Sequence, residues 1–162
     1  MPGPYHLRRT DREITDPAHI ASILERGRYV TYALVDDGEP YVVTLSYGYG
    51  AEARWLYHHV AHVGHKLDVI AREPRACGTV IIDGGYNRGE CEHPFESVVL
   101  RGRIHVVEDA AEKVRAMHTL VNHLESDPAT YWSSRPWKLQ DRVQGFTALA
   151  FEIESVTAKQ GS

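Results

Sequence analysis

Short runs rich in β-branched and aromatic residues recur along this chain, and few stretches have helical periodicity. Most of the runs are joined by short turn-forming segments, so strands do not alternate with helices as they do in parallel βαβ units. This order predicts a mainly β (α+β) fold, an antiparallel barrel of about six strands with flanking helices. The expected strands are 29–35, 41–47, 54–59, 75–82, 96–107 and 146–156.

The 41–47 run has the alternation of a half-buried strand. Val43 and Leu45 are expected on one face, and Thr44 and Ser46 on the other, because successive side chains of a strand point to opposite sides. This strand therefore offers an apolar face to a core and a small polar face to its surroundings.

Three helices are expected between the strands. Asp16 followed by Pro17 is typical of a helix start, with Asp as N-cap and Pro at the first helical position. A second helix is expected over 64–73. Asp109 with Glu112 three residues later resembles a capping box and predicts a third.

Length and charge narrow the function classes. The 162 residues suit one domain over 1–162, with a polar arm over 1–15 and an irregular segment over 130–144. A net charge of −4 disfavours nucleic acid and anionic membranes as partners, and no apolar run is long enough to span a membrane. Two cysteines and no apolar signal segment favour the cytoplasm.

The start of the second helix has the composition of an anion site. A helix start presents unpaired backbone N–H groups and the positive end of the helix dipole. Gly64 allows close approach to that backbone, His65 follows it, and Lys66 adds a positive charge. The combination predicts a phosphate site, and hence a phosphorylated cofactor.

Histidines crowd the segment before this helix, and imidazole also binds zinc and haem iron. Cys91 and His93 supply a second pair of metal-ligand types, but their spacing is a poor match to zinc ribbons. A metal site and a haem site are both alternatives to the phosphorylated cofactor, and His59 is the first candidate for a haem ligand. The crowded histidines are His58, His59, His62 and His65.

The ordered set of segments resembles the pyridoxamine 5′-phosphate oxidase-related superfamily, and within it the nitroimidazole-reductase-like branch. The likeness covers roughly residues 8–160, and it depends on the set rather than on one motif. The segments that carry it are 8–14, 41–49, 56–59, 64–68, 74–77, Cys91 with 97–102, 107–109 with 112–113, and 153–159.

The resemblance implies a split β-barrel that binds FMN, as a homodimer with two flavin sites at the subunit interface. It implies that the FMN phosphate lies near His65 and Lys66 and that the flavin ring lies against the backbone of the 43–46 strand. The strand from Ser97 is expected to line the site, from the same or the partner subunit. The expected cofactor-binding residues are Val43, Thr44, Leu45, Ser46, His59, Gly64, His65, Lys66, Ser97, Val98 and Val99.

The chain departs from the family at several positions. Relatives often have Pro and Asn where this chain has Thr44 and Ser46, and many have Arg where it has His65. The Arg and His residues that true pyridoxamine phosphate oxidases use on their substrate have no convincing counterpart. The chain is therefore expected to be related to that enzyme without sharing its reaction.

The leading hypothesis is an FMN-dependent oxidoreductase acting on a small aromatic or nitro-aromatic acceptor. Electron transfer through a flavin needs no side-chain nucleophile, so no catalytic side chain and no metal ligand are predicted. Two alternatives stay open: a haem-binding or haem-handling protein, and a flavin-binding protein without turnover.

Overall fold

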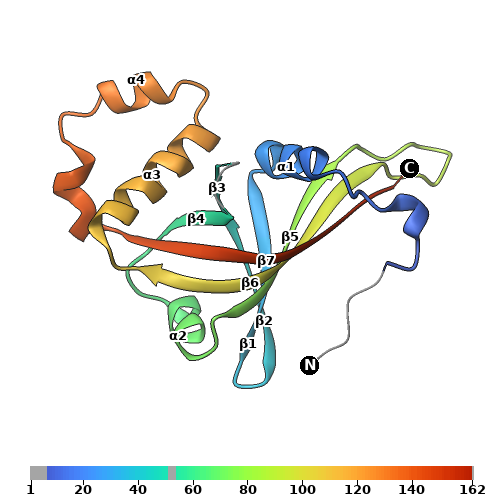
Figure 1. The fold of residues 1–162 in the computed structure, drawn as a ribbon, viewed down its shortest axis with the longest axis horizontal. Helices are drawn as coiled ribbons and strands as arrows, with labels where there is room; N and C mark the ends of the chain where they lie inside the picture. Colours follow the sequence, from blue (N-terminus) through green and yellow to red (C-terminus); the bar gives the residue numbers. More distant parts are fainter. Residues whose placement is uncertain (1–6, 51–53, 162) are drawn as a thin grey trace.

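The computed structural model describes residues 7–50 and 54–161. Its strands form one antiparallel sheet in the order β2-β1-β5-β6-β7-β4-β3, which curls into an open barrel (Figure 1). This confirms the mainly β fold, with one short strand, β3, more than expected. The strands are β1 (Tyr29–Asp36), β2 (Glu39–Ser46), β3 (Gly48–Tyr49), β4 (Trp55–Val60), β5 (Arg75–Asp83), β6 (Phe95–Val107) and β7 (Thr147–Gly161).

Helices flank this sheet at several places (Figure 1). Asp16 and Asp109 cap two of them, because their carboxylates accept from the N–H groups of Ala18 and Glu112, as the N-cap signals predict. In the described residues no helix is long and apolar enough to cross a membrane. The helices are α1 (Pro17–Arg26), α2 (His65–Arg72), α3 (Ala110–Leu124) and α4 (Pro128–Ser133), with 3₁₀ helices η1 (Thr10–Arg12) and η2 (Leu139–Gly145).

The β1–β2 hairpin has a two-residue turn. Asp37 and Gly38 both have positive φ, 50° and 92°, which is the turn that matches the twist of paired strands. In β2, Val43 and Leu45 pack against the barrel core, while Thr44 is exposed. The expected placement of Val43 and Leu45 on one face and Thr44 on the other is therefore confirmed, and the outer face also carries the exposed Val42.

The sheet does not close on itself. β2 pairs only with β1 at one end of the strand order, and β4 with β3 lies at the other end. The chain nevertheless passes from β2 to β3 within two residues, through the fully buried Tyr47, whose hydroxyl donates to the Leu24 carbonyl of α1 at 2.6 Å. This short crossing brings β2 close to β4, and we call the gap between them the seam.

Two segments differ from the sequence-based expectation. The 130–144 segment, expected to be irregular, contains most of α4 and η2, because Asp127 caps α4 through the N–H of Thr130. Part of the expected arm is packed: Ile14 is buried and its N–H donates to the Ala158 carbonyl at 2.9 Å. Residues 1–6 of the expected arm lie outside the described part of the chain.

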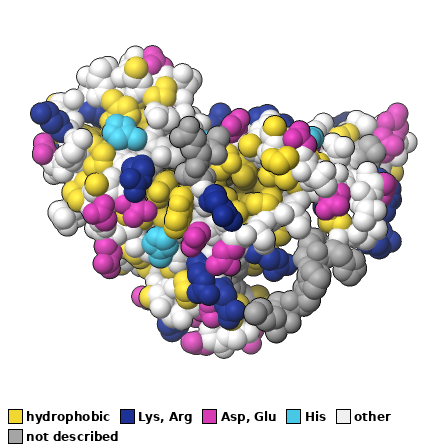
Figure 2. Space-filling view, viewed as in Figure 1, with side chains coloured by type: hydrophobic (Ala, Val, Ile, Leu, Met, Phe, Trp, Pro, Cys, Tyr) yellow, Lys and Arg dark blue, Asp and Glu magenta, His cyan; other side chains and the backbone are white. Residues whose placement is uncertain are grey.

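The buried side chains form two clusters. The larger fills the barrel and contains buried residues of α1, α2, β1, β4, β5, β6 and β7. The smaller lies where α3 and η2 cover β4 and β7, and it contains Tyr57, Leu139 and Phe146. A hollow of about 340 Å³ lies between α1 and β7, and apolar side chains gather beside α1 on this side of the molecule (Figure 2).

Candidate functional site

The turn between β4 and α2 presents an open helix start. Gly64 caps α2 with φ of 145°, a conformation that favours glycine, and no atom lies within 4 Å of the place a Cβ would occupy. Lys66 follows in the first turn and is half-buried. In the described residues this lysine has no hydrogen bond or ion pair, so its charge is free to meet an anion.

His65 has a different environment from Lys66. Its Nε2 donates to Asp36 at 2.6 Å, and the guanidinium of Arg72 donates to the other oxygen of the same carboxylate. Burial raises the pKa of Asp36, but the hydrogen bonds from His65 and Arg72 outweigh it, so the pKa lies below its usual value. The His65 imidazole, which was expected to hold phosphate, thus already donates its hydrogen bond to the Asp36 carboxylate at the end of β1.

The structure brings β2 and the start of α2 together. The Tyr41 ring of β2 meets the His65 ring edge to face, with 5.1 Å between their centroids. Asp36, just before the hairpin turn, adds the contact described above. The hairpin formed by β1 and β2 therefore contacts the start of α2 at His65.

The remaining predicted residues, 97–99, lie farther along the sheet on β6. Ser97 and Val99 line a mostly apolar hollow of about 590 Å³ on β5, β6 and β7, together with Ile81 and Phe95. Val98 is fully buried in the barrel, which leaves only its backbone available to a ligand.

Strand register gives the separation of this hollow from β2. Thr44 lies opposite Thr31, Thr31 opposite Thr79, and Thr79 opposite Val99. Neighbouring strands are about 4.8 Å apart, so three steps put Val99 about 14 Å from Thr44. Within one chain, the two groups share a sheet without being direct neighbours.

The crowded histidines separate onto different faces. His58 points into the barrel and is 1% exposed, while His59 is exposed and its ring lies 5.6 Å from that of Phe146. His62 bonds to Thr147 at 2.9 Å, and His93 to Asp83 at 2.8 Å. Across residues 7–50 and 54–161, no three His, Cys, Asp or Glu side chains converge as metal ligands would.

In the sequence His58 is a candidate metal or haem ligand, and the structure gives it a polar network instead. The Tyr32 hydroxyl lies 2.9 Å from His58 Nε2, and His58 Nδ1 lies 2.9 Å from the Ser46 carbonyl. Burial lowers the pKa of His58 to about 4, only partly opposed by the bond to Ser46, so the ring is neutral at pH 7. The sequence signal for this burial is that His58 lies on the same face of β4 as the apolar Leu56 and Val60, which pack in the barrel core.

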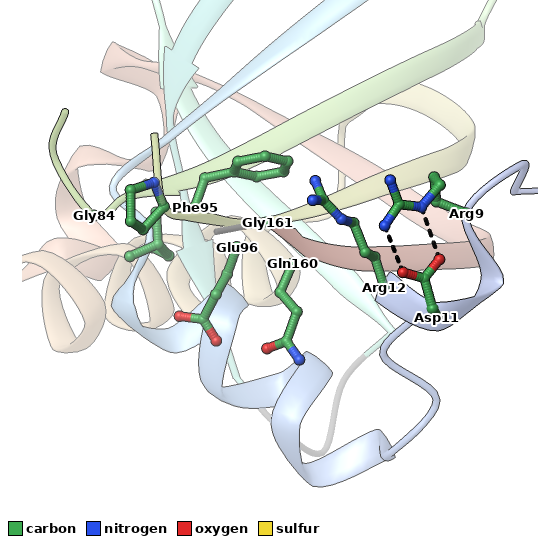
Figure 3. A pocket seen from close by; sticks show the side chains of 10 residues that line it. Arg9, Asp11, Arg12, Gly84, Phe95, Glu96, Gln160 and Gly161 are labelled. Carbon is green, nitrogen blue, oxygen red and sulfur yellow. Dashed lines mark hydrogen bonds and ion pairs between the residues drawn. The ribbon is translucent and has the colours of Figure 1, made fainter. Parts of the chain in front are cut away.

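A third hollow lies away from these residues, beside η1, the start of β6 and the end of β7 (Figure 3). It measures about 550 Å³, and Arg9, Arg12, Phe95 and Glu96 are among its lining residues. Arg9 forms a forked ion pair with Asp11, as the dashed lines in Figure 3 show. None of the predicted phosphate or ring residues lines this hollow.

Comparison with known proteins agrees with the resemblance seen in the sequence. The profile of a family described as pyridoxamine 5′-phosphate oxidase matches residues 16–160. No curated protein matches the sequence.

Solved structures share the fold. A candidate 5-nitroimidazole antibiotic resistance protein from Bacteroides thetaiotaomicron has 24% identity and a TM-score of 0.76, over 92% of this chain and 86% of that one. A flavocytochrome from Azotobacter vinelandii has 19% identity and a TM-score of 0.76, over 96% of this chain and 72% of that one. A FAD and heme binding protein from Mycobacterium smegmatis has 21% identity and a TM-score of 0.76, over 93% of this chain and 74% of that one.

Proposed function

This chain belongs to the pyridoxamine 5′-phosphate oxidase family, and from that premise we propose that it is an FMN-dependent oxidoreductase acting on a small aromatic or nitro-aromatic acceptor. The observation that carries the proposal is Lys66. It is a half-buried cation without a partner in the described residues, in the first turn of a helix whose cap, Gly64, leaves the backbone open. Such a helix start suits a phosphate monoester.

The neighbouring strand supports the position of the ring. β2 reaches the helix start through the contact of Tyr41 with His65, so a molecule with its phosphate at Lys66 has β2 beside it. On this strand Thr44 is exposed, and its hydroxyl lies 3.0 Å from that of Thr31. The small side chains leave the sheet surface accessible to a flat ring system.

When bound, a flavin supplies the electron transfer, and the protein's residues bind it, orient it and control access. Solved relatives described as flavocytochrome, FAD-binding and nitroimidazole-resistance proteins have the same fold, which supports flavin chemistry and a nitro-aromatic acceptor.

A homodimer is part of the proposal. Large apolar side chains are exposed on the outer surface of three neighbouring strands: Tyr29 is 65% exposed, Val42 59% and Ile81 60%. Exposed apolar side chains of this kind mark interaction surfaces, and a second copy covering this surface brings its 97–99 strand to a site that one chain leaves incomplete.

The dimer is tested by Ile81→Glu, which should convert it to an 18.3 kDa monomer in light scattering. The matched change at Val106, exposed but on none of these three strands, should leave the dimer intact.

The phosphate role is tested with Lys66→Met, which keeps the apolar stem and removes the charge. A charge-assisted contact is worth about 1.5–3 kcal/mol, so FMN affinity should fall about ten- to a hundredfold in fluorescence titration. Lys138→Met is the matched control, because this exposed lysine lies in the segment before η2. Equal affinities in wild type and Lys66→Met would remove the basis of the proposal.

Haem is the second candidate, and His59 is the observation that favours it. This exposed imidazole has no hydrogen bond or ion pair in the described chain, so its nitrogens are available to iron. Two relatives with the same fold are described as a flavocytochrome and a FAD and heme binding protein. An absorbance spectrum of the purified protein separates the two cofactors. Turnover with a reduced nicotinamide and a nitro-aromatic dye then separates an enzyme from a flavin carrier.

A further inference from the structure

The two ends of the open sheet are joined inside the barrel by one histidine. His58 of β4 contacts Tyr32 of β1 and the Ser46 carbonyl of β2, each at 2.9 Å. No backbone ladder joins β4 to β1 or β2 in the described sheet. The network of Tyr32, His58 and Ser46, here called the seam network, is thus a polar connection across the seam.

The chemistry of the three groups fixes the direction of both bonds. A carbonyl oxygen only accepts, so His58 Nδ1 carries the proton and donates to Ser46. The remaining nitrogen, Nε2, then accepts from the Tyr32 hydroxyl. Tyr32 is fully buried and His58 is 1% exposed, so water does not compete for these bonds. Each polar atom of the two side chains is satisfied, which makes the arrangement specific.

The proposed flavin site has one subsite on each side of the seam. The ring subsite lies on β2, which ends at Ser46. The phosphate subsite lies at Gly64 and Lys66, four and six residues after the last residue of β4. Since His58 belongs to β4, its bond to Ser46 links the two strands that carry the two subsites.

We infer that His58 is a positioning residue that sets the spacing between the ring subsite and the phosphate subsite of the flavin site. This inference rests on the proposed function. A ligand that uses both subsites gains the full benefit of the second contact only when their spacing matches its own length. A ligand that uses only the ring subsite is indifferent to the spacing.

A second connection across the seam lies at the surface. Asp36 at the end of β1 joins β1 and β2 to α2 through His65, which is 57% exposed at its side chain. Exposed ion pairs hold geometry weakly because solvent screens them and their side chains are mobile. Of these two side-chain connections the buried network is the stiffer, and it adds to the backbone crossing at Tyr47, where Gly48 of β3 pairs with Tyr57 of β4.

The test compares FMN with riboflavin, which has the same ring but no phosphate. The measured quantity is the ratio of the riboflavin Kd to the FMN Kd, from fluorescence titration at 25 °C. His58→Phe removes both bonds and fills the volume, and it should lower this ratio about tenfold, mainly by weakening FMN. His58→Asn places an amide N–H near the Nδ1 position, and it should keep the ratio within about threefold of wild type.

Ile104→Ala is the control for a general loss of stability. Ile104 is fully buried in the same core on β6 and makes no polar contact across the seam. Its variant should melt at a lower temperature and keep the wild-type ratio. A ratio that falls equally in Ile104→Ala and His58→Phe would assign the effect to stability and overturn the inference.

The remaining outcomes separate this inference from the proposed function. A folded His58→Phe protein with the wild-type ratio overturns the positioning role, while flavin binding by the wild type leaves the proposed function standing. A wild type that binds neither flavin overturns both. If His58→Phe does not fold, Tyr32→Phe decides: loss of this hydroxyl frees one side of the ring and should lower the ratio about threefold, and an unchanged ratio overturns the role.

Discussion

Asp36 and His65 are joined by a 2.6 Å hydrogen bond that connects the end of β1 to the first turn of α2. Arg72, the last residue of α2, donates to the other oxygen of the same carboxylate. The negative charge of Asp36 therefore lies beside the helix start where the flavin phosphate is proposed, and it opposes the favourable charge of Lys66.

Asp36→Asn should strengthen FMN binding. The change removes a negative charge and frees His65 and Arg72 to face the phosphate, so FMN affinity should rise about threefold at low salt, with riboflavin affinity unchanged. Fluorescence titration at two salt concentrations measures this, and the gain should shrink at 1 M salt. Asp37→Asn is the matched control, because Asp37 is far more exposed and its contact with Arg72 is longer, 3.6 Å. Weaker FMN binding in Asp36→Asn would mean that the carboxylate orients His65 toward the phosphate.

His58 should make the protein less stable as pH falls below neutral. Burial lowers the pKa of His58 to about 4, below the value of 6.5 for an exposed histidine. Between these two values the unfolded chain binds a proton that the folded chain does not, so stability is full above pH 6.5 and declines until about pH 4. The single residue accounts for about 3 kcal/mol over this range, of which about 2 kcal/mol is lost by pH 5.

The comparison of wild type with His58→Phe isolates this contribution, since other histidines titrate in the same range. The free energy of unfolding in urea, measured at pH 7 and pH 5, should fall by about 2 kcal/mol more in wild type than in the variant. Parallel losses in the two proteins would show that His58 is not held neutral.

Gly64→Ala should cost stability through the backbone alone. The φ of 145° is strained for any residue with a Cβ, although no atom lies near enough to clash with one. Strain of this kind costs about 1–3 kcal/mol, and relief of it would displace the N–H groups at the start of α2. Thermal unfolding and FMN titration should both show a loss. Gly145→Ala is the matched control, because its Cβ also meets open space and its φ is not in the positive range. Similar melting temperatures for the two variants would contradict the strain argument.

Local signals in the sequence were sufficient for most elements. Asp16-Pro17 and Asp109 with Glu112 cap helices in the structure, and the alternation of 41–47 matches its two faces. These features depend on residues within one helical turn or one strand, so their physical causes lie in neighbouring residues. The β4 segment and the helix after it follow from neighbouring residues for the same reason.

What only the tertiary structure decided is which distant residues meet. Asp36 holds His65 across 29 residues, and His58 reaches Tyr32 across 26 and the Ser46 carbonyl across 12. Nothing in the local spacing of these residues encodes the contacts, because they follow from the order in which seven strands pair and from the curl that brings β2 to β4. The sequence by itself determined the helix start at Gly64 and Lys66 and the half-buried strand β2, where the phosphate and the ring are proposed to bind. The curl of the sheet decided that β2 lies close to β4 and that the buried His58 joins these two strands.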